Sequence, residues 1–138
     1  MLSQPLICTI GYVFRNAGHI RPYLETPRSG PTSVFCSELA ARLRCYVASG
    51  YCEGIPDHEV TEGLDADGNT ATRVGANSAV VYGPDGEWVH GYRKSNLYDT
   101  DMSWAISGAS ILPLIEYVHA HVVHSQETGL PLSSFLHH

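Results

Sequence analysis

The sequence has few basic residues and no cluster of them. Its 138 residues contain 8 Lys and Arg against 14 Asp and Glu, which gives a formal net charge of -6 at neutral pH. Proteins that bind nucleic acid present a basic patch or stripe, so this composition argues against that class of partner. Long apolar runs are also absent, which argues against a membrane-spanning segment.

The chain also lacks the marks of a secreted or disulfide-linked protein. Residues 1–5 carry neither the basic charge nor the apolar run that opens a secretory signal. No cysteine follows Cys52, and the cysteines show no CxxC spacing; they are Cys8, Cys36, Cys45 and Cys52. Each lies on or beside an apolar segment, where cysteine behaves as a small hydrophobic residue. We therefore expect free thiols in a soluble, cytoplasmic protein.

What the sequence contains favours a single α/β domain. A chain of this length usually forms one domain, and 43% hydrophobic residues supply a modest core. Residues 33–44 are expected to form a helix capped by Thr32 or Ser33. A strand over residues 45–51 should pack under it. The apolar face of the helix is predicted at Val34, Phe35, Leu39 and Leu43.

The remaining segments are less regular. Residues 6–10 are predicted to form a short buried strand, and residues 15–29 a loop or short helical turn. Residues 57–75 are rich in Gly, Asp, Glu and Thr, which favours a surface loop. Residues 114–124 have the spacing of a short amphipathic helix, followed by a loose tail.

The clearest pattern is a β-hairpin over residues 76–92. The two strands are predicted at 77–82 and 87–92, because β-branched and aromatic residues dominate both. Gly83-Pro84-Asp85-Gly86 between them is turn chemistry. The second strand delivers Lys94 to the point where a loop begins. A side chain fixed by a strand and bordering a loop is well placed to act as a catalytic cation.

The stretch NSAVVYGPDGEWVHGYRKSNLYDTDMSWA, residues 77–105, resembles the carbon–nitrogen hydrolases of the nitrilase and amidase superfamily. The motif around Lys94 is most similar to that of fungal amidases that deamidate N-terminal Asn and Gln of proteins. The resemblance runs from about Leu6 to Gly108. It implies part of a four-layer α-β-β-α sandwich over residues 1–108, followed by a divergent C-terminal tail over residues 109–138.

The resemblance also implies a mechanism and its participants. In that family a cysteine thiolate attacks the amide carbon, a glutamate moves the proton, and a lysine stabilises the oxyanion. Lys94 matches the lysine, whereas Leu6 occupies the expected glutamate position and no cysteine follows Cys52. The implied substrates are protein or peptide N-termini, with no cofactor. We therefore expect this chain to be inactive alone, as a non-catalytic fragment or a pseudoenzyme that retains a binding cleft.

Several other polar residues can be interpreted either as part of a functional site or as ordinary loop residues. The family places an acidic residue after the lysine to orient the lysine or the substrate, which makes Asp99 and Asp101 candidate substrate-binding residues; the alternative is a pair of loop carboxylates. Glu53 is more consistent with a solvated loop position than with a substrate contact. No metal site is expected, because the late histidines lack acidic or thiol partners; they are His119, His121, His124, His137 and His138.

Overall fold

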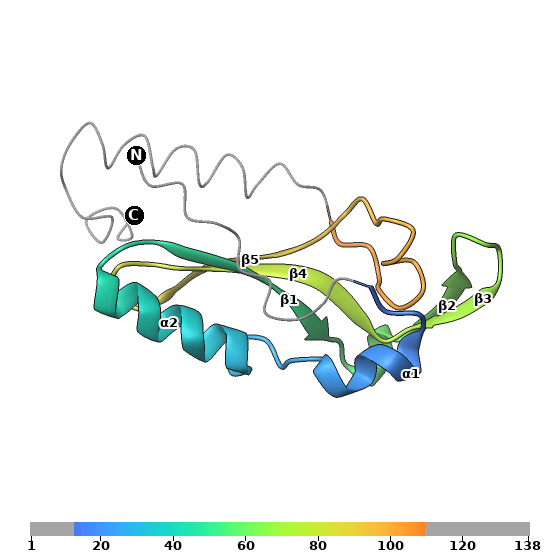
Figure 1. Ribbon diagram of the computed structural model, residues 1–138, viewed down its shortest axis with the longest axis horizontal. Helices are drawn as coiled ribbons and strands as arrows, with labels where there is room; N and C mark the ends of the chain where they lie inside the picture. The colour runs from blue at the N-terminus through green and yellow to red at the C-terminus, as the bar shows by residue number, and fades with distance from the viewer. Residues whose placement is uncertain (1–12, 110–138) are drawn as a thin grey trace.

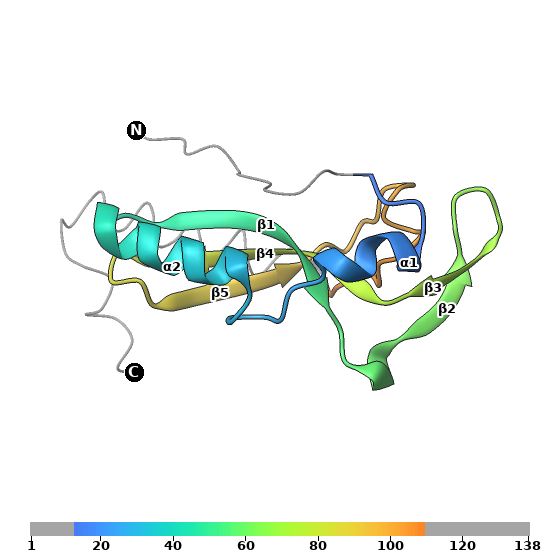
Figure 2. The same ribbon diagram turned by 60° about the horizontal axis from the view of Figure 1, so that its bottom comes forward.

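The centre of the molecule is a three-stranded antiparallel sheet with one helix along its face. A computed structural model describes residues 13–109. The sheet has the order β1 (Val47–Gly54), β4 (Gly75–Tyr82), β5 (Trp88–Arg93), with β4 in the middle. Helix α2 (Pro31–Leu43) lies along one face (Figure 1), and Figure 2 shows it running beside the strands. The prediction of a mixed α/β fold is confirmed in this coarse form.

The hairpin predicted over residues 76–92 is confirmed. Strands β4 and β5 pair antiparallel, with Ser78 opposite Arg93 and Val80 opposite Gly91. The turn closes where proline and glycine were expected, and Gly86 adopts a φ of 82°, a left-handed conformation that favours glycine. Ser37 of α2 donates a hydrogen bond to the carbonyl of Gly86 at 2.7 Å, which fastens the turn to the helix.

The helix and the strand after it are also confirmed, but the predicted cap is wrong. Thr32 and Ser33 lie inside α2 and are buried, and Gly30 occupies the cap position. The carboxylate of Glu25 accepts hydrogen bonds from the Thr32 amide at 2.8 Å and the Thr32 hydroxyl at 2.7 Å. An acidic group is favourable at a helix N-terminus because the first amides there lack partners within the helix. A tertiary contact thus replaces the local cap.

The predicted apolar face of α2 is wrong as well. Val34, Phe35 and Leu43 are about half exposed, whereas Cys36 and Ala40 are fully buried against the sheet. Small side chains let the helix backbone approach the strands closely, and the core then fills with large side chains from the sheet. Those are Val47, Tyr51, Val80 and Tyr82. Leu39 packs at the margin of this cluster, as the only member of the predicted face that contacts it.

Residues 57–75 are not the loop that was expected. They begin with a 3-10 turn, η2 (Asp57–Glu59), and continue as a hairpin of β2 (Thr61–Leu64) and β3 (Thr70–Arg73). The Asp65 carboxylate accepts amide hydrogen bonds from Asp67 and Asn69 and closes the turn. The polar composition reflects a hairpin that projects from the sheet into solvent (Figure 1), not a lack of regular structure.

A second core lies at the end of the sheet opposite the β4–β5 turn. Helix α1 (Ala17–Ile20) and the 3-10 turn η1 (Arg21–Tyr23) match the short helical turn predicted for residues 15–29. They pack beside the segment around Trp104, whose carbonyl accepts the amide of Val74 at 2.8 Å. The buried members of this cluster are Phe14, Ile20, Val74, Trp104 and Ala105. This packing holds the loop that follows β5 against the sheet.

Some predictions concern segments outside the described residues. These are the strand at 6–10, the helix at 114–124, the tail and its histidines, and the position of Leu6 and Cys8. Within residues 13–109, no helix has both the length and the apolar character needed to cross a lipid bilayer.

Candidate functional site

Strand β5 ends at the cation Arg93, and a second cation, Lys94, follows it directly. Successive side chains of a strand point to opposite faces of its sheet. Arg93 lies opposite Ser78 on the α2 side, and the backbone amide of Lys94 continues the ladder by donating to the Asn77 carbonyl at 2.8 Å. The two cations therefore enter different environments, and each meets a buried carboxylate.

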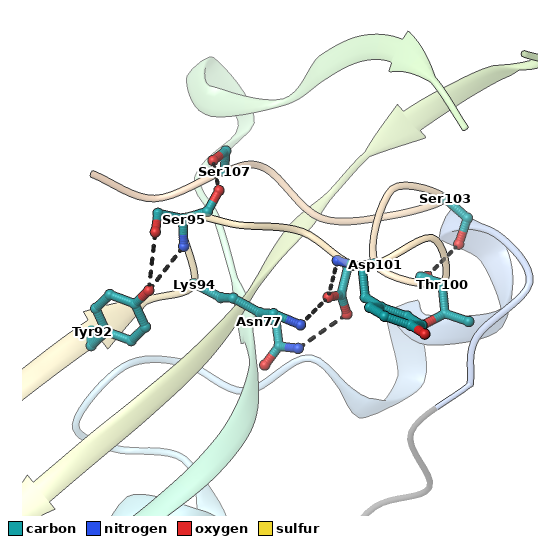
Figure 3. A network of polar contacts seen from close by, with 9 residues as sticks. Asn77, Tyr92, Lys94, Ser95, Thr100, Asp101, Ser103 and Ser107 are labelled. Atoms are coloured by element: carbon teal, nitrogen blue, oxygen red, sulfur yellow. Dashed lines mark hydrogen bonds and ion pairs between the residues drawn. The ribbon is translucent and has the colours of Figure 1, made fainter. Parts of the chain in front are cut away.

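Lys94 is ion-paired with Asp101. Its Nζ lies 2.6 Å from Asp101 Oδ2, and the Asp101 side chain is 1% exposed while that of Lys94 is 28% exposed. Figure 3 shows both Lys94 and Asn77 reaching the same carboxylate. Lys94 is also the single lysine of the whole sequence. The predicted catalytic position is thus a partly exposed ammonium held by a buried anion.

The Asp101 carboxylate is fixed by two further donors. The Asn77 side-chain amide donates to Oδ1 at 3.0 Å, and the Tyr98 backbone amide donates to Oδ2 at 3.0 Å. The turn itself closes through the Asp101 amide, which donates to the Tyr98 carbonyl at 2.8 Å. Both oxygens of Asp101 therefore have partners within the chain, which favours the interpretation that Asp101 orients the lysine.

Asp99, the other predicted binding residue, lies in a different position. Its side chain is exposed, as is the neighbouring Tyr98, whose ring centroid is 6.0 Å from Lys94 Nζ. The structure therefore separates the two predicted carboxylates, because Asp101 points into the protein and Asp99 faces solvent. A role in substrate binding remains a prediction for Asp99.

Glu53 is not the solvated loop residue that was expected. It belongs to β1, is 6% exposed and accepts hydrogen bonds from the Ser78 hydroxyl at 2.7 Å and the Tyr51 hydroxyl at 3.3 Å. The guanidinium of Arg93 donates to Glu53 Oε1 through Nε at 3.0 Å and a terminal nitrogen at 2.6 Å. Its other terminal nitrogen contacts Glu59 at 2.6 Å. The network ties the last residue of β5 to β1 and η2.

The electrostatics of this network follow from its burial and charges. Hydrogen bonds to the Glu53 carboxylate raise the pKa of Arg93 above its ordinary value, so the guanidinium stays charged. Burial raises the pKa of Tyr51, and the negative charge of Glu53 raises it further. Tyr51 is therefore neutral at physiological pH and serves as a hydrogen-bond donor.

A cavity of about 550 Å³ lies next to this network and is lined by residues of β1, β4 and β5. Glu53 and Arg93 form its polar part, and Trp88 and Tyr92 contribute aromatic surface. The Arg28 guanidinium carbon stands 3.9 Å from the centroid of the Trp88 ring, which is within the range of a cation–π contact. Among the described residues, β5 is an outer strand of the sheet and pairs only with β4.

The described cysteines are poor nucleophiles or lie apart from Lys94. Cys36 of α2 is fully buried against the sheet, and burial raises the pKa of its thiol. Cys45 and Cys52 have intermediate exposure. Cys52 pairs with Asn77 across β1 and β4, so a whole strand separates it from Lys94. Within residues 13–109, no group of three His, Cys, Asp or Glu side chains is arranged to hold a metal ion.

The sequence pointed to Lys94 and Asp101 but not to Asn77 or to the Glu53–Arg93 pair. Asn77 is a polar residue at the start of a strand-forming run, and the neighbouring Ser78 is polar too, so the local pattern does not single Asn77 out. The Glu53–Arg93 contact joins residues forty positions apart, so no local pattern could reveal it.

Comparison with known proteins finds similarity to amidases. No protein-family model matches the sequence. The chain is 31% identical to a protein N-terminal amidase of Schizosaccharomyces pombe over 110 residues, which are 78% of this chain and 34% of that protein. It is 30% identical to a protein N-terminal amidase of Saccharomyces cerevisiae over 100 residues, 72% of this chain and 19% of that protein.

Solved structures give the same result. A crystal structure of N-terminal amidase with an Asn-Glu-Ala peptide matches 75% of this chain and 21% of its own, with 29% identity and a TM-score of 0.56. Another crystal structure of N-terminal amidase, with a Gln-Val peptide, matches 70% of this chain and 19% of its own, with 30% identity and a TM-score of 0.53. The chain is therefore similar to part of a protein N-terminal amidase, as its sequence indicated, and spans about a third or less of these relatives.

Proposed function

We propose that this chain carries the lysine-bearing part of a site that hydrolyses the side-chain amide of an N-terminal Asn or Gln. The observation that carries the proposal is the ammonium of Lys94, which is fixed by the buried Asp101 at the end of a strand. The similarity to N-terminal amidases, with bound peptides that begin with Asn or Gln, supports this substrate class. The products are ammonia and a chain that begins with Asp or Glu.

The chemistry assigned to Lys94 is electrostatic. Attack on an amide carbon places negative charge on the carbonyl oxygen, and a fixed cation stabilises that charge more effectively than mobile water does. Asp101 holds the ammonium in place, so little reorganisation is needed when the charge develops. Asp99, exposed beside this pair, is the carboxylate that we assign to the positively charged amino group of the substrate.

We propose further that the chain alone does not complete the reaction. The family mechanism needs a thiolate and a glutamate, and this sequence has Leu6 at the glutamate position and no cysteine after Cys52. Removing one member of a catalytic group that acts together already lowers the rate by several orders of magnitude. The second candidate function, favoured by the same absences, is binding of peptide N-termini without hydrolysis.

Ammonia release from the peptide Asn-Glu-Ala tests both proposals. The chain alone and its Lys94→Ala variant are expected to remain at the peptide-only background. In a chimera, residues 13–109 replace the matching segment of the S. pombe amidase, and there we expect release that Lys94→Ala abolishes and Arg28→Ala, at the cavity rim, leaves intact. A folded chimera that retains full activity with Lys94→Ala contradicts the role of the lysine. Turnover by the chain alone that depends on Lys94 contradicts its inactivity.

A further inference from the structure

Asn77 occupies a position that links both ends of the ion pair. Its backbone carbonyl accepts the Lys94 amide at 2.8 Å, and its side-chain amide donates to Asp101 Oδ1 at 3.0 Å (Figure 3). One residue therefore contacts the main chain that carries the ammonium and the carboxylate that receives it. Asn77 also lies on β4, the central strand, which is paired on both sides.

The Asp101 carboxylate belongs to a turn, so a hydrogen bond from the central strand adds a fixed point outside that turn. Asp101 lies in a turn, and its Oδ2 already receives both Lys94 Nζ and the Tyr98 amide. The terminal torsion of an aspartate side chain has broad energy wells, so each donor on the carboxylate narrows the range of orientations that it samples. The Asn77 donor holds Oδ1, the oxygen that the Lys94 and Tyr98 donors do not contact, and it comes from a strand and not from the turn.

We infer that Asn77 is a positioning residue for Lys94, acting through Asp101. It sets the orientation of the Asp101 carboxylate, and the carboxylate sets the direction of the ammonium. The inference rests on the proposed function for its meaning in catalysis, since a fixed cation stabilises a developing oxyanion better than a mobile one. The orientation of Lys94 itself can be measured without substrate, so this inference and the proposed function can fail separately.

The test uses the single lysine of the chain. When the 138-residue protein is labelled with lysine carrying ¹³C at the ε carbon, its NMR spectrum reports Lys94 alone. A held ammonium keeps the two Hε protons in different surroundings, so they give separate resonances and a high order parameter. The variants are Asn77→Ser and Asn77→Thr, of which threonine suits a strand well. Both side chains are too short to reach Asp101. Backbone amide spectra establish that each variant is folded.

We expect the two Hε resonances to merge and the order parameter to fall in both Asn77 variants and in Asp101→Asn. Adding Asn77→Thr to Asp101→Asn should cause no further change, because the two residues act in series. Tyr92→Phe is the matched control: it removes the contact of the Tyr92 hydroxyl with the Ser95 amide, next to Lys94, and should leave the resonances separate. A folded Asn77 variant with the parental splitting, or an additional change in the double variant, overturns the inference.

Discussion

Arg93 and Lys94 are adjacent in sequence, yet their surroundings differ in kind. Arg93 meets two carboxylates, Glu53 and Glu59, through three of its guanidinium nitrogens, and Glu53 reaches it across the central strand. Lys94 meets Asp101, which comes from the turn after its own strand. The arginine is thus part of a network that connects strands, whereas the lysine is a partly exposed cation paired with a buried carboxylate from the turn that follows.

This difference indicates which cation is structural. The planar guanidinium suits multiple fixed contacts, and its charge is already balanced by two anions. A compact ammonium that is paired with a buried carboxylate and is itself partly exposed keeps a positive field on its exposed side, where a developing negative charge can be stabilised. Four sets of variants test this distinction.

The largest effect on stability is expected from Glu53→Ala. It leaves the Arg93 guanidinium without its buried partner and removes the acceptor of the Ser78 and Tyr51 hydroxyls, at a cost of about 3 to 5 kcal/mol in the free energy of unfolding. Urea denaturation measures it. The control is Glu59→Ala, at the more exposed end of the same guanidinium, which should cost less than about 1 kcal/mol. Equal losses in the two variants contradict the assignment.

Arg93→Lys is expected to be the next most damaging change, although it preserves the charge. A lysine cannot contact Glu53 twice and Glu59 at the same time, so at least one charge-assisted hydrogen bond is lost, worth about 2 kcal/mol. Lys94→Arg is the companion variant and should be tolerated better, because a guanidinium can still donate to the Asp101 carboxylate that pairs with Lys94. If Arg93→Lys has parental stability in thermal or urea unfolding, the network does not depend on guanidinium geometry.

Asp101→Asn should reduce stability by a smaller amount, about 1 to 2 kcal/mol, because the amide keeps one oxygen for the Tyr98 donor while the ionic attraction to Lys94 is lost. Asp99→Asn, at an exposed position two residues away, should be close to neutral. Chemical denaturation of both variants provides the comparison. An Asp99→Asn loss as large as that of Asp101→Asn is inconsistent with a special role for the buried carboxylate.

The smallest effect concerns alkaline pH. The pKa of Tyr51 is raised in the folded protein, so above about pH 10 the unfolded chain loses this proton while the folded chain keeps it. Stability from this group is complete below that pH and falls as pH rises above it, by at most about 1.4 kcal/mol per pH unit. Tyr51→Phe should flatten the decline, and Tyr98→Phe, at an exposed tyrosine, should not. Unfolding measured between pH 9 and 11 distinguishes them.

Local structure follows from the sequence where a short segment contains strong turn, strand or helix patterns. The Pro84-Asp85-Gly86 turn is flanked by strand-forming runs, and both strands formed where expected. The helix starting near residue 31 and the strand after it also followed from local pattern. The hairpin at 61–73 was missed because its strands are short and polar, with no apolar alternation to reveal them.

The candidate site could be predicted only in part, because some of its contacts join residues that are far apart in the sequence. Lys94 could be located because the strand, the turn and the motif around it are contiguous. Asp101 could be named as one of two carboxylates, but burial distinguished it from Asp99. The roles of Asn77 and Glu53 depend on contacts 24 and 40 residues away in the chain.

Turn chemistry and periodicity act over a few residues, so the hairpin, the helix and the position of Lys94 after a strand follow from local sequence alone. Packing in the folded chain sets which side of α2 faces the sheet. Cys36 and Ala40 face it because close approach of the helix backbone requires small side chains. It also decided which carboxylate each cation receives. Alternation along β5 sends Arg93 and Lys94 to opposite faces, and only the folded chain places Glu53 on one face and Asp101 on the other.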